Sequence, residues 1–80
     1  MKYVYILRSI ENSNKTYIGL TGDLKRRLKD HNSNQSTYTS KYSPWNIETY
    51  VAFSNEQKAQ EFERYLKHSG GWRFLQRRLI

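Results

Sequence analysis

The shortness of the chain, 80 residues without a cysteine, is the main limit on what it can fold into. This length accommodates one domain, so we expect a single domain over residues 1–80. Such a domain buries only about 60% of its unfolded surface, and no disulfide or thiolate zinc site can reinforce it. Packing alone must hold the fold together, as in an ordinary cytoplasmic protein. We therefore expect a thin core and a functional site on an open surface or in a shallow groove.

The charge is strongly positive, with 14 Lys and Arg residues against 7 Asp and Glu residues and a net charge of +7. Such a field attracts polyanions, so nucleic acid is the favoured partner; the alternative is a basic protein whose charge only prevents aggregation. A membrane partner is disfavoured, because no apolar run approaches the ~20 residues of a spanning helix and the N-terminus does not resemble a signal peptide.

The predicted order of elements is ββαβαα, which indicates an α+β domain with a three-stranded antiparallel β-sheet flanked by helices. Runs of aromatic and β-branched residues predict the strands, and polar turn residues separate the first two into a hairpin. The expected strands cover residues 3–7, 15–20 and 47–53.

Capping signals and apolar spacing predict the helices. The first should begin after Thr21-Gly22-Asp23 and end near residues 31–32. Ser54 with Gln57 forms a capping-box pattern for the second, which Gly70-Gly71 should stop. A short basic helix is expected from 72 to 79. Residues 33–44 predict a loop that has room for a short helical turn.

Alternation in the first two strands places aromatic side chains together. Tyr3 and Tyr5 share one face of their strand, and Tyr17 and Gly19 share one face of theirs. If the hairpin register aligns these faces, tyrosines cluster beside a residue without a side chain, which often marks close approach by another backbone or a ligand. The alternative for each tyrosine is a packing role. The residues expected to face the core are Val4, Ile6, Ile18 and Leu20.

Charged and polar side chains border the apolar stripes of both main helices. Arg27 and His31 lie beside the stripe of the first helix, where an arginine whose stem covers apolar surface and a histidine at a helix C-terminus are the structural alternatives. Glu63 lies beside the stripe of the second helix and needs a partner, because burying an unpaired carboxylate is costly. That partner is either Arg27 or a divalent cation.

Such residues around one sheet suit metal-assisted hydrolysis of a phosphodiester. Glu63 would hold Mg²⁺ or Mn²⁺, Arg27 would stabilise charge in the transition state, and a tyrosine or His31 would move the proton. With only two histidines in the chain, a metal site must use carboxylate ligands. We expect Tyr5, Tyr17, Arg27 and Glu63 to converge on one face of the sheet.

Four motifs, in order, resemble the GIY-YIG nuclease domain, and the similarity spans the whole chain. The motifs are Tyr3-Val4-Tyr5, Tyr17-Ile18-Gly19, Leu24-Lys25-Arg26-Arg27-Leu28 with His31-Asn32, and Glu63-Arg64-Tyr65-Leu66-Lys67. The chain is most similar to short single-domain members that look like the nuclease module of the bacterial excision-repair incision subunit. The first motif departs from Gly-Ile-Tyr in a way that short members share.

The resemblance implies roles for individual residues. It makes Tyr5 and Tyr17 the signature tyrosines and Gly19 the motif glycine. It makes Arg27 the contact to the scissile phosphate and Glu63 the single metal-binding residue. His31 matches a histidine that assists proton transfer in some branches. The implied reaction is one-metal hydrolysis that leaves a 5′-phosphate and a 3′-hydroxyl, on DNA in preference to RNA.

Larger family nucleases carry a phosphate-binding Asn after the glutamate, and this chain has no Asn after Glu63. Lys67, Arg73 or Arg77 could supply that contact. The residues expected to contact nucleic acid are Gly19, Lys15, Arg26, Lys67, Arg73 and Arg77. One rival is a non-catalytic nucleic-acid-binding module with the same fold and basic surface. Another is a protein-binding surface formed by Trp45, Trp72 and Phe74, aromatic residues whose favoured role is to close the small core.

Overall fold

The computed structural model describes residues 1–33 and 37–80, and its elements confirm the predicted α+β class and the ββαβαα order. A short helix, α2, adds one turn within the segment predicted as a loop. The elements are β1 (Lys2–Ser9), β2 (Thr16–Thr21), α1 (Leu24–Asn32), α2 (Thr37–Ser40), β3 (Trp45–Phe53), α3 (Glu56–Leu66) and α4 (Ser69–Arg78). Within the described ranges, no helix has the length and apolar character that crossing a bilayer requires.

The sheet has the strand order β2-β1-β3, with both pairs antiparallel, so β1 is central and β2 has a free edge. The hairpin register sets Tyr5 opposite Gly19 and Leu7 opposite Tyr17. Since these positions alternate along both strands, their side chains share one face of the sheet. The predicted alignment of the tyrosine faces is therefore confirmed.

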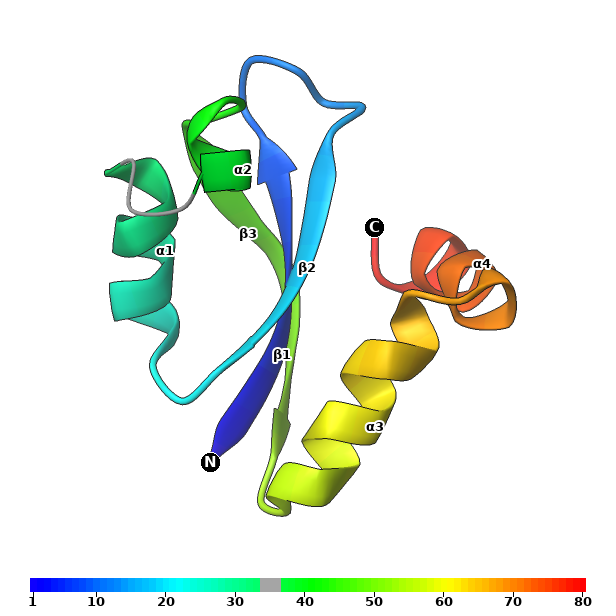
Figure 1. The fold of residues 1–80 in the computed structure, drawn as a ribbon. Helices are drawn as coiled ribbons and strands as arrows, with labels where there is room; N and C mark the ends of the chain where they lie inside the picture. The colour runs from blue at the N-terminus through cyan, green and yellow to red at the C-terminus, as the bar shows by residue number, and fades with distance from the viewer. Residues whose placement is uncertain (34–36) are drawn as a thin grey trace.

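Helices cover both faces of the sheet, as Figure 1 shows with α1 and α2 on one side and α3 and α4 on the other. On the α3 side, Val4 and Ile6 are fully buried against Ala59, Leu66 and Leu75. The other predicted core residues, Ile18 and Leu20, belong to the same cluster. We call this the α3 face, and the face under α1 the tyrosine face.

The tyrosine face has a second, smaller core. Tyr5, Leu7 and Trp45 are buried there and pack against Leu24 and Leu28 of α1. Two thin cores separated by one sheet are what a chain of this size can form, because each helix buries only one apolar stripe.

Two helix boundaries differ from the prediction. The N-cap of α3 is Asn55 and not Ser54, because the Asn55 side chain accepts a hydrogen bond from the Lys58 backbone N–H at 3.0 Å. Asparagine caps a helix as well as serine does, so the sequence offered two equivalent starts. α3 ends at Leu66, before Gly70-Gly71, and these glycines lie in the first turn of α4.

A close approach between helices explains the second glycine. A Cβ on Gly71 would collide with the Tyr65 backbone carbonyl, so only glycine fits where α4 turns away from α3.

Strand β3 begins at Trp45, two residues before the predicted start at Ile47. Pairing of residues 45 and 46 with the end of β1 accounts for the extension. The Asn32 side chain also holds Trp45, because its Oδ1 accepts from the Trp45 N–H at 2.6 Å and its Nδ2 donates to the Trp45 carbonyl at 3.1 Å. The Asn32 side chain at the end of α1 therefore makes hydrogen bonds to the Trp45 backbone like those of a neighbouring strand, and it joins α1 to the sheet.

Candidate functional site

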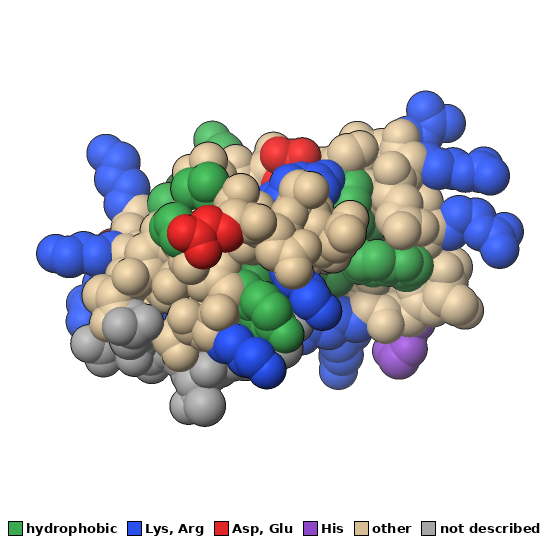
Figure 2. Space-filling model, turned by 90° about the horizontal axis from the view of Figure 1, so that it is seen from above, with side chains coloured by type: hydrophobic (Ala, Val, Ile, Leu, Met, Phe, Trp, Pro, Cys, Tyr) green, Lys and Arg blue, Asp and Glu red, His purple; other side chains and the backbone are tan. Residues whose placement is uncertain are grey.

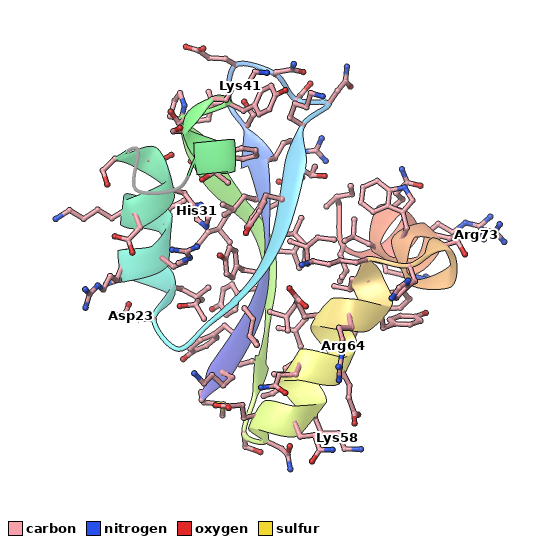
Figure 3. All side chains as sticks on the ribbon, viewed as in Figure 1. Asp23, His31, Lys41, Lys58, Arg64 and Arg73 are labelled. Carbon is pink, nitrogen blue, oxygen red and sulfur yellow. The ribbon has the colours of Figure 1, made fainter. Side chains whose placement is uncertain are left out.

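Tyr5 is the centre of a hydrogen-bonded cluster beneath α1. Its side chain is 2% exposed, and its hydroxyl lies 2.9 Å from His31 Nε2. Arg27 Nε donates to the same hydroxyl at 3.4 Å. The other ring nitrogen of His31, Nδ1, lies 2.6 Å from the hydroxyl of buried Thr39. Two predicted residues of α1 thus reach the predicted tyrosine of β1, and Figure 3 shows His31 pointing from α1 toward the sheet.

Gly19 makes room for this cluster. A Cβ at this position would collide with the ring and hydroxyl of Tyr5, which lies opposite in the hairpin. The close approach expected at Gly19 therefore comes from a tyrosine of the chain itself. A role for Gly19 in binding nucleic acid stays a prediction.

Tyr17 completes the ring cluster at the more accessible side. Its ring centroid lies 5.0 Å from that of His31 and 6.4 Å from that of Tyr5. Unlike Tyr5, Tyr17 is only partly buried. Tyr3 does not join the cluster, because its ring packs edge-on against Tyr50 at 5.9 Å.

The surroundings fix the charge states of the cluster. Burial, together with the charge of Arg27, lowers the pKa of His31, so the imidazole is neutral at pH 7. Burial raises the pKa of Tyr5 more than the hydrogen bond and charge of Arg27 lower it, so Tyr5 keeps its proton. The hydrogen bond to Tyr5 raises the pKa of Arg27, which stays a cation.

The neutral, buried His31 predicts a stability that depends on pH. The unfolded chain takes up the histidine proton near pH 6.5, above the pKa of folded His31. Stability should therefore be full above pH 6.5 and fall below it, by up to about 1.4 kcal/mol per pH unit for one proton. Melting temperatures between about pH 7.5 and 5.5 measure this. His31→Gln should flatten the profile, whereas the control His68→Gln, at an exposed histidine, should not. A level wild-type profile would contradict the burial of a neutral His31.

Glu63 corrects the expectation that all the site residues lie on one face of the sheet. Its helix, α3, packs on the α3 face, opposite Tyr5, Tyr17 and Arg27 (Figure 1). The helical spacing placed Glu63 beside a buried stripe correctly, but it carried no information on which face the stripe covers. In the structure the Glu63 carboxylate pairs with Lys67 Nζ at 2.7 Å in place of Arg27, and the divalent cation stays a prediction.

Glu63 still acts on the tyrosine cluster. Its charge contributes to the raised pKa of Tyr5, as the last of several causes. The free edge of β2 is where the two sides meet. An open pocket of about 320 Å³ lies there, lined by Thr16, Tyr17, Ile18, Lys67 and Trp72. Lys67, the C-cap of α3, and Trp72 of α4 therefore line the same pocket as Tyr17.

The donor set around Glu63 suits one kind of metal. Its side chain is 18% exposed, so a carboxylate oxygen is accessible to a cation and its waters. Among the described residues, no group of three or more His, Cys, Asp or Glu side chains could enclose a metal ion. A site with one carboxylate fits a hydrated Mg²⁺ or Mn²⁺, which keeps waters and phosphate oxygens as its other ligands, better than zinc.

The predicted nucleic-acid contacts do not form one patch. Lys67 lies at the pocket, whereas Lys15 is stacked over the Tyr42 ring at 5.1 Å from its centroid. Arg26 lies in a depression on the outside of α1, and Arg73 points away from the sheet (Figure 3). Arg77 is exposed in the last turn of α4. Figure 2 shows Lys and Arg side chains projecting at the α1 side and at the α4 side of one face.

Two residues of the site were not predicted from the sequence. Thr39 lies in the segment predicted as a loop, and no pattern there indicated that its hydroxyl would meet His31. Trp72 was interpreted mainly as a core residue, yet it is 39% exposed and lines the pocket at β2. An aromatic residue directly after the helix-start glycines was the only signal, and it also fits packing.

Comparison with known proteins adds an independent observation. A family model described as the GIY-YIG catalytic domain matches residues 1–71. A UPF0213 protein of Clostridium perfringens is 37% identical, over 84% of this chain and 71% of that protein. The structure-specific endonuclease subunit SLX1 of Candida dubliniensis is 40% identical over 82% of this chain, but this corresponds to 26% of that protein. The chain thus spans about a quarter of that relative's length.

A solved structure shows the same fold. The solution structure of a UPF0213 protein from Bacillus halodurans superimposes with a TM-score of 0.57 and 28% identity, over 99% of this chain and 87% of that one.

Proposed function

The chain belongs to the GIY-YIG family, and on this premise we propose that it is a metal-dependent endonuclease domain that hydrolyses phosphodiester bonds of DNA by a one-metal mechanism. The hydrogen-bonded cluster of Tyr5, Arg27 and His31, with Tyr17 beside it, is the observation that carries the proposal. The endonuclease named among the relatives supports the same reaction class.

Arg27 is the residue that meets the phosphate. Its guanidinium is anchored by Tyr5 and lies 3.9 Å from Asp30, while its side chain is 36% exposed. A fixed, permanently charged group at an accessible position stabilises negative charge that grows on non-bridging oxygens during hydrolysis. Tyr5 and His31 act through Arg27 and Tyr17 as positioning residues.

Tyr17 is the residue that takes the proton of the attacking water. Tyr5 is buried and its raised pKa keeps it protonated, so it is a poor base. Tyr17 is partly exposed at the pocket, and neutral His31 lies beside it. An accessible hydroxyl within reach of water is the first requirement for a general base.

Glu63 is the residue that would hold the divalent cation. Bound there, Mg²⁺ or Mn²⁺ supplies Lewis-acid stabilisation of the phosphate and the leaving oxygen. Lys67, which neutralises Glu63 in the structure, becomes available to a phosphate when the carboxylate has another partner.

The two tyrosines should respond differently to replacement by phenylalanine. Tyr17→Phe should slow cleavage about a hundredfold, the usual scale for loss of a general base. Tyr5→Phe should mainly cost stability, about 1–3 kcal/mol, because buried His31 loses a hydrogen-bond partner. Single-turnover cleavage rates and thermal melts measure both effects. A Tyr5→Phe protein slower than Tyr17→Phe would reverse the assignment.

The second candidate function is a binding module that keeps the fold and basic surface without cutting. Basic side chains project at both the α1 side and the α4 side of the molecule (Figure 2), and this spread favours broad electrostatic binding of nucleic acid. Both functions predict affinity for DNA that falls with salt. Only the enzyme requires Glu63 and a divalent ion, so cleavage with and without chelator separates the two.

A further inference from the structure

The residues that would hydrolyse the phosphodiester, Tyr17 and Lys67, account for only part of the pocket at the free edge of β2. Trp72 and Lys67 line it together with the strand residues 16–18. Trp72 does not enter the mechanism, and the residue is 39% exposed.

We propose that this pocket binds an unpaired nucleobase beside the phosphodiester to be cut, with the base stacked on Trp72 and its phosphate at Lys67. The inference rests on the proposed function and specifies its substrate class as nucleic acid with an unpaired nucleotide at the cut.

The chemistry of the walls matches a nucleotide. An indole face stacks on any base, and an ammonium group binds a phosphate. Residues 16–18 of the edge strand β2 complete the lining, beside the indole and the ammonium group. The volume of about 320 Å³ lies at the lower end of pockets that hold small ligands.

The position of the pocket ties it to the reaction. Lys67 contacts the Glu63 carboxylate at 2.7 Å, and Tyr17 lines the pocket while touching His31. A nucleotide held between Trp72 and Lys67 would therefore place its phosphate next to the metal-binding carboxylate. A paired base cannot leave its stack without cost, so flaps, single strands and distorted junctions should be preferred to intact duplex.

Tryptophan fluorescence can test the stacking directly. The chain has two tryptophans, and Trp45 is 1% exposed, so the response to ligand should come from Trp72. The probes are a thymine oligonucleotide of about ten nucleotides and an abasic one of the same length, at low salt with chelator. We expect the thymine strand to quench emission and to bind about tenfold tighter than the abasic strand.

Variants locate the effect. Trp72→Ala should remove the preference for bases without changing affinity for the abasic strand, and Trp72→Phe should retain part of it. Phe74→Ala is the matched control, an aromatic residue 37% exposed on the same helix but outside the pocket, and it should behave as wild type. Circular dichroism checks that each variant is folded.

Equal affinity of wild type for the two strands overturns the proposal, as does an equal loss for both strands in Trp72→Ala. No binding to either strand also overturns the proposal. So does a result in which an apolar peptide competes for the pocket and a thymine strand does not. The binding assay contains chelator, so its result does not depend on cleavage. A chain that shows base preference but cuts nothing refutes the proposed enzymatic function alone. A chain that cuts without base preference refutes the pocket alone.

Discussion

Replacing Glu63 by glutamine is expected to lower DNA cleavage about a thousandfold or more. The change removes the negative charge that would hold the divalent ion but keeps the shape of the side chain. A bound metal is worth several kcal/mol of transition-state stabilisation, and each 1.36 kcal/mol is tenfold in rate. Single-turnover rates at saturating Mn²⁺ measure the loss.

The fold should survive this change. The Glu63–Lys67 pair is a partly exposed pair one helical turn apart, which is worth only about 0.3–0.5 kcal/mol. Glu61→Gln is the matched control, an exposed acid on the same helix that should leave the rate unchanged. Equal rates for Glu63→Gln and wild type would show that the metal assignment is wrong.

Replacing Arg27 by glutamine should lower cleavage by about a hundredfold to a thousandfold, the scale seen when one fixed donor to a developing negative charge is lost. The effect should appear in the rate of the chemical step more than in DNA affinity, because Arg27 is one of many cations but the only one anchored by Tyr5 among the described residues. Cleavage rates at saturating DNA, together with fluorescence anisotropy for affinity, separate the two.

The neighbouring Arg26 provides the control for Arg27. It is exposed on the outside of α1, beside Asp23 and Asp30, and carries the same charge. Arg26→Gln should weaken DNA binding slightly at low salt and leave the chemical step intact. If both variants lose the same activity, Arg27 contributes only to the overall electrostatic field.

Local patterns in the sequence predicted most of the fold and half of the site. Alternation placed Tyr5, Tyr17 and Gly19 on one face because side-chain direction in a strand follows from position alone. Helical spacing placed Arg27 and His31 at the border of the α1 stripe for the same reason. Neither inference needed knowledge of distant contacts.

The rest depended on tertiary packing. The spacing along α3 identified its buried stripe, but only the two-sided covering of the sheet puts Glu63 opposite the tyrosines. The contact between His31 and Thr39 joins residues on two short helices, and no local pattern encodes it. Asn55 and Ser54 were equally good caps, so the sequence alone could not choose between them.

Cleavage by the unmodified chain tests the central claim most directly. Labelled branched, nicked, flapped and single-stranded DNA, incubated with Mn²⁺ or with chelator, would show whether any phosphodiester is cut and which ends result. We expect metal-dependent cleavage of at least one substrate with an unpaired nucleotide, leaving a 5′-phosphate and a 3′-hydroxyl. Intact substrate in every reaction with Mn²⁺ would contradict it and leave the binding module as the function of this chain.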